Sequence, residues 1–165
     1  VTKGLPFSTN SVDLISSSHA LEHFTFPVGL ALLRECRRVL KPTGGMRIMV
    51  PDAGLLMNMY AEDIMGYDRN KLNYGEFQLD QFNEINQGCA SMKSPAAKLW
   101  ALLHEGHSAC YDYLTLENAL TVAGFKPFHT SFREAATEQT KQIVREVIES
   151  FPCLTLAVDA VPNVG

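Results

Sequence analysis

The stretch from Leu5 to Asp52 constrains the fold of this 165-residue chain more than any other part of it. Val12 to Ser17 is a short run with apolar residues behind a turn-forming Ser-Thr-Asn-Ser cluster, which predicts a buried strand. Leucines at helical spacing follow Pro27, which suits a first helical turn, and Lys41-Pro42-Thr43-Gly44-Gly45 is expected to end the helix with a basic last turn and glycines. The stretch therefore begins as a strand followed by a helix.

A second strand is predicted from Met46 to Val50, ended by Pro51. Two parallel strands joined by a helix form a right-handed crossover unit, and ligands bind such sheets beyond the carboxyl ends of the strands. Polar residues stand at both of these ends: Ser17, Ser18 and His19 after the first strand, and Asp52 after the second. We expect this edge to carry the functional site.

The remainder of the chain predicts an α/β domain with an insertion. Residues 53–60 continue with helical periodicity, whereas Gly66 to Ser94 shows no clean period and suggests irregular segments over the ligand edge. We therefore expect a single truncated domain over residues 1–165 with an inserted lid-like segment at about 53–110. Helices are expected at 95–103, at 114–123 with Gly124 as C-cap, and at 134–149 with Ile143 facing inward. Strands are expected at 127–132 and at 154–161, and burial should alternate along the second of these.

Composition excludes several classes of protein. The net charge of -4 leaves no basic stripe, which disfavours nucleic acid as a partner. No apolar run approaches about 20 residues, so no membrane span is expected. Four cysteines without a C-x-x-C spacing predict reduced thiols and a cytoplasmic protein.

Several motifs together resemble the class I S-adenosylmethionine-dependent methyltransferases, particularly the small bacterial predicted-methyltransferase group. They are Thr2 to Phe7; Asn10 to Asp13 with Ser17-Ser18-His19-Ala20-Leu21-Glu22-His23; Leu33-Arg34-Glu35 through Val50-Pro51-Asp52; and Gly106-His107, Tyr111-Asp112 and Ala123-Gly124-Phe125. The resemblance implies a Rossmann-like sheet of strand order 3-2-1-4-5-7-6 with the seventh strand antiparallel. This chain would supply the fourth to seventh strands and their flanking helices.

The family's Gly-rich cofactor turn is missing. No two of the 11 glycines stand in a G-x-G arrangement, and other residues do not easily replace glycine where backbone must approach a ligand closely. The chain is thus expected to be the C-terminal half of a methyltransferase domain with an incomplete cofactor site. Val12 to Ser17 would then be an uncovered edge strand, which predicts a homo-oligomer, simplest as a homodimer, formed through it.

The resemblance also implies site residues. His23, His107 and Tyr111 would face the methyl acceptor, and Thr2, Ser17, Ser18 and His19 would contact S-adenosylmethionine. An alternative for His23 is that it caps or supports the following helix. Asp112 is expected to accept backbone N–H bonds at the start of the helix near Leu114.

His104, His107 and Cys110 form an H-x-x-H-x-x-C pattern of the kind that binds zinc. The pattern lacks a nearby fourth ligand, and the resemblance already accounts for His107, so no metal is expected from the sequence.

Two functions follow from the sequence. The first is an S-adenosylmethionine-dependent methyltransferase, or the C-terminal half of one, acting on an unidentified small-molecule acceptor. The alternative is a non-catalytic remnant that acts as an oligomerisation or binding module.

Overall fold

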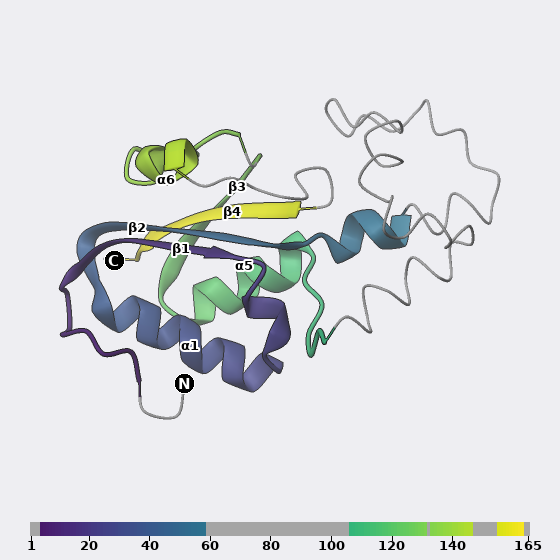
Figure 1. The fold of residues 1–165 in the computed structure, drawn as a ribbon, viewed down its shortest axis with the longest axis horizontal. Coiled ribbons are helices and arrows are strands. Elements are labelled where there is room, and N and C mark those ends of the chain that lie inside the picture. The colour runs from purple at the N-terminus through teal and green to yellow at the C-terminus, as the bar shows by residue number, and fades with distance from the viewer. Residues whose placement is uncertain (1–3, 59–105, 132, 147–154, 164–165) are drawn as a thin grey trace.

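The computed structural model describes residues 4–58, 106–131, 133–146 and 155–163. A four-stranded mixed sheet has α1 and α5 on one face and α6 on the other (Figure 1). The elements are β1 (Val12–Ser18), η1 (Leu21–His23), α1 (Phe26–Val39), β2 (Leu40–Pro51), α5 (Tyr113–Val122), β3 (Phe125–Thr130), α6 (Lys141–Glu146) and β4 (Thr155–Pro162). Most of the predicted lid-like segment, and the predicted helix at 95–103, lie outside the described residues.

The strand order β1-β2-β4-β3 confirms the predicted fold class. β1 runs parallel to β2, with Ser17 opposite Ile48, and β4 is antiparallel to both β2 and β3. This is the order expected for the fourth, fifth, seventh and sixth strands of the methyltransferase sheet. Within the described residues β1 lies at one end of the sheet, as predicted.

The helix α1 confirms the predicted crossover, and the stretch predicted to end it begins with unpaired residues: Val12 pairs with Leu40 and Leu14 with Gly45, so residues 41–44 have no partner in β1. Pro27 lies in the first turn, and one face buries Leu33, Cys36 and Val39. Leu40 is already extended, so β2 starts directly at the end of the helix and includes residues 41–45. Gly45 is needed for close packing, because a Cβ there would lie 2.6 Å from the Cβ of Gln139.

The helix α5 and its cap match the expectation. Leu116, Leu120 and Ala123 are buried, and Gly124 adopts a φ of +92°, the left-handed region that glycine favours at a helix end. Strand β3 begins at Phe125, two residues earlier than predicted, because Gly124 already completes the reversal of the chain.

The C-terminal part departs from the sequence pattern in two places. Among the described residues of 134–149, only Lys141–Glu146 are helical, although Ile143 is buried as expected. β4 does not alternate in burial: every residue from Leu156 to Ala160 is buried, since the strand lies between β2 and β3 and has helices on both faces.

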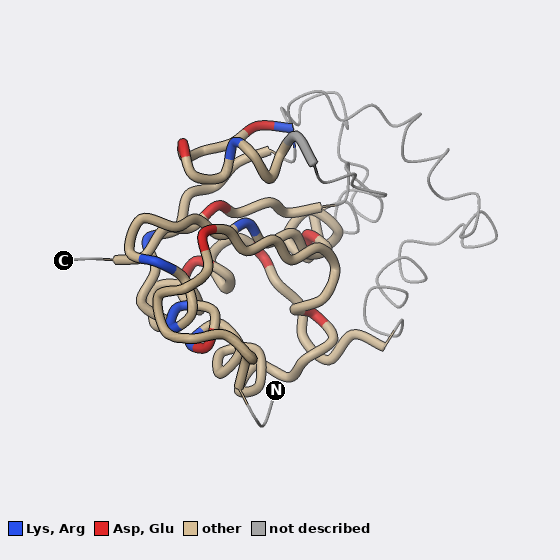
Figure 2. The backbone as a smooth tube through the Cα atoms, turned by 60° about the vertical axis from the view of Figure 1, so that its left-hand side comes forward, with Lys and Arg blue, Asp and Glu red and all other residues tan. Residues whose placement is uncertain are grey.

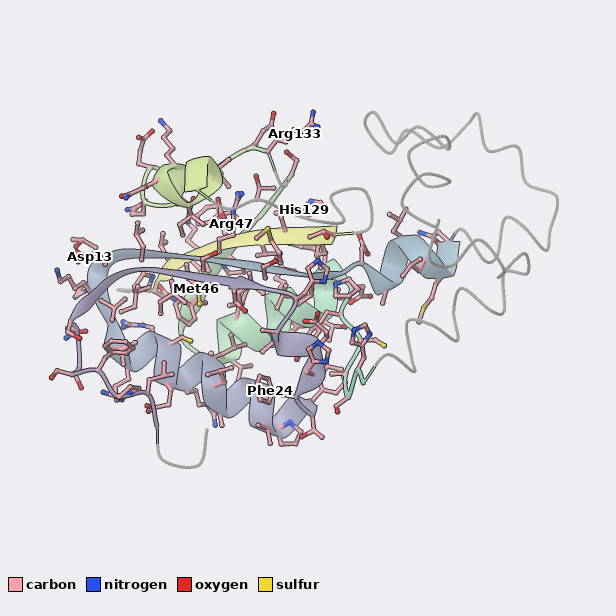
Figure 3. All side chains as sticks on the ribbon, in the orientation of Figure 1. Asp13, Phe24, Met46, Arg47, His129 and Arg133 are labelled. Atoms are coloured by element: carbon pink, nitrogen blue, oxygen red, sulfur yellow. The ribbon has the colours of Figure 1, made fainter. Side chains whose placement is uncertain are left out.

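A buried ion pair joins β2 and β4. The Nε of Arg47 donates to the Oδ1 of Asp159 at 2.7 Å, and both side chains are almost fully inaccessible. Arg47 also donates to the carbonyl oxygen of Glu134, which ties the segment before α6 to the sheet (Figure 3). Elsewhere, acidic and basic residues are interspersed along the described backbone (Figure 2). None of the described helices is long and apolar enough to cross a membrane.

Candidate functional site

The carboxyl ends of β1 and β2 meet at one edge of the sheet, because the two strands are parallel neighbours. Ser17 is half-buried, Ser18 is exposed, and His19 turns the chain with a φ of 46°, an uncommon value for a residue with a side chain. The N–H of His19 donates to the carbonyl of Met49 at 2.9 Å. The structure thus brings three of the four predicted cofactor residues to this edge, and Thr2 lies outside the described residues.

The imidazole of His19 bridges the edge. Its Nε2 lies 3.1 Å from the hydroxyl of Thr155 at the start of β4. Its Nδ1 lies 3.5 Å from Oε1 of Glu22, an ion-pair distance without a hydrogen bond. His19 therefore connects the end of the sheet to the short helix η1.

Glu22 is the unusual residue of η1. Its side chain is 2% exposed, and among the described residues neither carboxylate oxygen has a hydrogen-bond partner. Buried polar groups in proteins are almost always hydrogen-bonded, and an unpaired buried carboxylate is costly. Sequence reasoning quoted Glu22 within a motif but assigned it no role. The sequence signal that could have pointed to Glu22 is an acidic residue directly after Leu21, which is itself buried in the core.

The segment from Gly106 to Ala109 is fastened to η1 by its backbone. The N–H groups of Ser108 and Ala109 both donate to the carbonyl of Glu22, at 2.8 and 3.0 Å. Nδ1 of His23 lies 3.2 Å from the carbonyl oxygen of Gly106. These contacts place the rings of His23 and His107 with their centroids 5.0 Å apart, so two of the predicted acceptor-facing residues lie together.

Tyr111, the third predicted acceptor residue, lies in the core. It is 2% exposed, and its ring packs edge-on against Phe26 at 5.3 Å between centroids. Burial, and secondarily the charge of Glu22, raise the pKa of Tyr111 to about 12. The phenol is therefore neutral at physiological pH, and contact with the acceptor remains a prediction from the resemblance.

Two aspartates at this edge cap helices. Oδ1 of Asp52 accepts from the N–H of Leu55 at 2.9 Å, and burial raises the pKa of Asp52. Oδ1 of Asp112 accepts from the N–H of Thr115 at 2.8 Å, which confirms the cap predicted for it, and the hydrogen bonds from Thr115 lower the pKa of Asp112. Both carboxylates thus have a local structural task.

Potential metal donors gather in a different combination from the predicted H-x-x-H-x-x-C pattern. His104 lies outside the described residues, and the Cys110 thiol is half-buried with a pKa raised by burial. Glu22, His23 and His107 each offer a donor atom, and these atoms all lie within 4.8 Å of one another.

Residues 1–48 match the family model described as a methyltransferase domain. Among solved structures, the YcgJ protein from Bacillus subtilis is similar, with a TM-score of 0.50, 12% identity, and coverage of 100% of this chain and 70% of that one. A SAM-dependent methyltransferase from Archaeoglobus fulgidus has a TM-score of 0.49 and 15% identity, with coverage of 93% and 61%. PKMT2 from Rickettsia typhi has a TM-score of 0.49 and 14% identity, with coverage of 98% and 37%. No curated protein matches the chain significantly.

The chain spans 61% of the Archaeoglobus protein and 37% of the Rickettsia protein, less than two thirds of each. The sheet and the match over residues 1–48 confirm the resemblance to the class I S-adenosylmethionine-dependent methyltransferases.

Proposed function

We propose that this chain contributes to an S-adenosylmethionine-dependent methyltransferase, with the cofactor at the carboxyl edge of β1 and β2. One observation carries the proposal: the residues that match a methyltransferase domain include β1 and the polar loop at its carboxyl end. The donors there also suit the cofactor chemically. Hydroxyls of Ser17 and Ser18 and the imidazole of His19 can exchange hydrogen bonds with ribose hydroxyls and with the amino and carboxylate groups of the methionine part.

S-Adenosylmethionine supplies a methyl group on a positively charged sulfur, which a nucleophile displaces in line. The protein's task is then mainly to position the two partners and to accept a proton where the nucleophile carries one. His23 suits the second task. A carbonyl oxygen only accepts hydrogen bonds, so Nδ1 of His23 is the donor to Gly106, and Nε2 is left with its lone pair.

The acceptor is proposed to be a small molecule bound beside His23 and His107. The two ring centroids lie 5.0 Å apart, and His23 belongs to η1, which follows β1 in the chain. We further propose that two copies of the chain pair through β1, since this strand has only β2 as a neighbour among the described strands. A monomer mass by light scattering at micromolar concentration would contradict the pairing.

Isothermal titration with S-adenosylhomocysteine tests the cofactor site. We expect saturable binding, weaker than a complete site would give because this chain lacks the Gly-rich half of the cofactor site. Ser18→Trp places a large ring at the carboxyl edge and should weaken binding at least tenfold. Thr43→Trp is the matched control, because Thr43 is exposed near the opposite end of β2 and should leave binding within twofold. Absence of binding by the folded protein, or equal effects of the two variants, would refute the proposal.

A further inference from the structure

We infer that Glu22, His23 and His107 form a binding site for a divalent transition-metal ion, Zn²⁺ first among them. Two imidazoles and one carboxylate are a recurrent ligand set for zinc and related ions, and they leave at least one coordination position open. Their donor atoms lie within 4.8 Å of one another. The site is distinct from the H-x-x-H-x-x-C pattern, with which it shares only His107.

The protein backbone holds these residues together without the ion. Glu22 and His23 belong to η1, and His107 lies far along the chain. The two hydrogen bonds from the N–H groups of Ser108 and Ala109 to the carbonyl of Glu22 fix one segment on the other. The donors are therefore gathered by contacts in which none of the three donor side chains takes part.

The carboxylate of Glu22 gives independent support for a cation. It is buried, 2% exposed, and neither of its oxygens has a hydrogen-bond partner in the part of the chain that the structure describes. An ionised carboxylate in such a place needs a compensating charge. His19 Nδ1, at 3.5 Å from Oε1, does not form a hydrogen bond with it. A divalent ion bound to the carboxylate would supply a direct partner that is always charged.

His23 is oriented as metal-binding histidines commonly are. Its Nδ1 donates to the backbone carbonyl of Gly106, which fixes the tautomer and leaves Nε2 as a ligand atom. The side chain is exposed, so it can move toward an ion. Ligands about 2.1 Å from a tetrahedral ion lie about 3.4 Å apart, so binding would draw the three donors inward by about 1 Å.

An ion here would lie next to the proposed cofactor edge, because His19 contacts both Glu22 and Thr155 of β4. Its open position could bind an oxygen, nitrogen or sulfur atom of the methyl acceptor and orient it. That last role rests on the proposed function and would replace the proton-accepting role of His23, because the ion would take the lone pair of its Nε2. Binding of the metal itself does not rest on the proposed function.

The test is titration of chelator-treated protein with ZnCl₂ by calorimetry, with metal content after dialysis as a second readout. We expect one Zn²⁺ per chain. Glu22→Gln and His107→Gln should each weaken binding at least tenfold, while circular dichroism shows that both variants remain folded. His129→Ala is the control, because this exposed histidine lies on β3 and belongs to no group of potential metal donors among the described residues.

Cys110→Ser separates the two possible zinc sites. We expect it to bind Zn²⁺ as the unmodified protein does. Failure of the folded protein to bind Zn²⁺, or loss of binding in Cys110→Ser with retention in Glu22→Gln, would overturn the inference. Because no cofactor is present in these titrations, their failure is distinguishable from a failure to bind S-adenosylhomocysteine.

Discussion

Two buried carboxylates in this molecule have opposite surroundings. Asp159 in β4 accepts from Arg47 Nε and Nη2 at 2.7 and 3.2 Å, from the N–H of Ala136 at 2.7 Å, and from the hydroxyl of Thr140 at 2.6 Å. Glu22 in η1 accepts no hydrogen bond from the described residues at either oxygen. Both are almost fully inaccessible, so burial alone does not separate them.

The difference teaches which carboxylate holds the fold and which is placed for a ligand. Asp159 is saturated and links β2, β4 and the segment before α6. Glu22 has only His19 at ion-pair distance and no hydrogen bond within the described residues, an arrangement that proteins tolerate mainly where a site is to be filled. We therefore expect opposite changes in the free energy of unfolding when the negative charge of Asp159 or of Glu22 is removed.

The largest effect is expected at Asp159. Asp159→Asn leaves the guanidinium of Arg47 buried without its counter-charge, which should lower the free energy of unfolding by about 3–5 kcal/mol. Urea denaturation followed by circular dichroism measures it. Replacing both partners, as Arg47→Met with Asp159→Leu, should recover only part of the loss, because the N–H of Ala136 and the hydroxyl of Thr140 lose Asp159 as their acceptor. A loss of less than about 1 kcal/mol in the free energy of unfolding of Asp159→Asn would show that the ion pair is not essential to the fold.

A smaller change of opposite sign is expected at Glu22. Glu22→Met keeps the approximate size of the side chain and removes the unpaired carboxylate, so the metal-free protein should become more stable by about 1–2 kcal/mol. The same denaturation experiment applies, with chelator present because a bound ion would stabilise the native state of the unmodified protein. If the variant is instead destabilised, Glu22 has a stabilising partner and the comparison fails.

The smallest effect concerns Tyr111, which senses the charge of Glu22. Its pKa is raised to about 12 from an ordinary value of 10.0, so the native state holds the phenolic proton more tightly than the unfolded chain. That contribution to stability is complete below pH 10.0 and is lost as pH rises toward 12. In Glu22→Met the pKa should fall but stay above 10.0, because burial is the larger cause.

Ultraviolet titration of phenolate absorbance, with Tyr111→Phe to identify the signal, measures this pKa. An unchanged value in Glu22→Met would indicate that Glu22 carries no charge in the folded protein.

Much of the fold could be predicted from the sequence because its signals are local. The crossover between β1 and β2 follows from apolar periodicity and from Pro27, and the end of α5 follows from Gly124. The glycine at position 45 has a further reason that is not local: Gln139, from a distant part of the chain, approaches it so closely that a Cβ would not fit.

The site was predictable only in part for the same reason. His19, His23 and His107 were found through motifs, and the structure brings His23 and His107 together. The difference in hydrogen bonding between Glu22 and Asp159 could not be predicted, since the partners of Asp159 come from β2 and from residues 136–140. A carboxylate that lacks partners is recognised only when everything around it has been placed.

Hydrogen–deuterium exchange with and without saturating S-adenosylhomocysteine tests the central claim most directly, that the carboxyl edge of β1 and β2 is the ligand edge and the Asp159 network is scaffold. The account predicts slower exchange in peptides covering Ser17 to Phe24, and no change in those covering residues 134–140. Slower exchange at 134–140 without any change at Ser17 to Phe24 would contradict it.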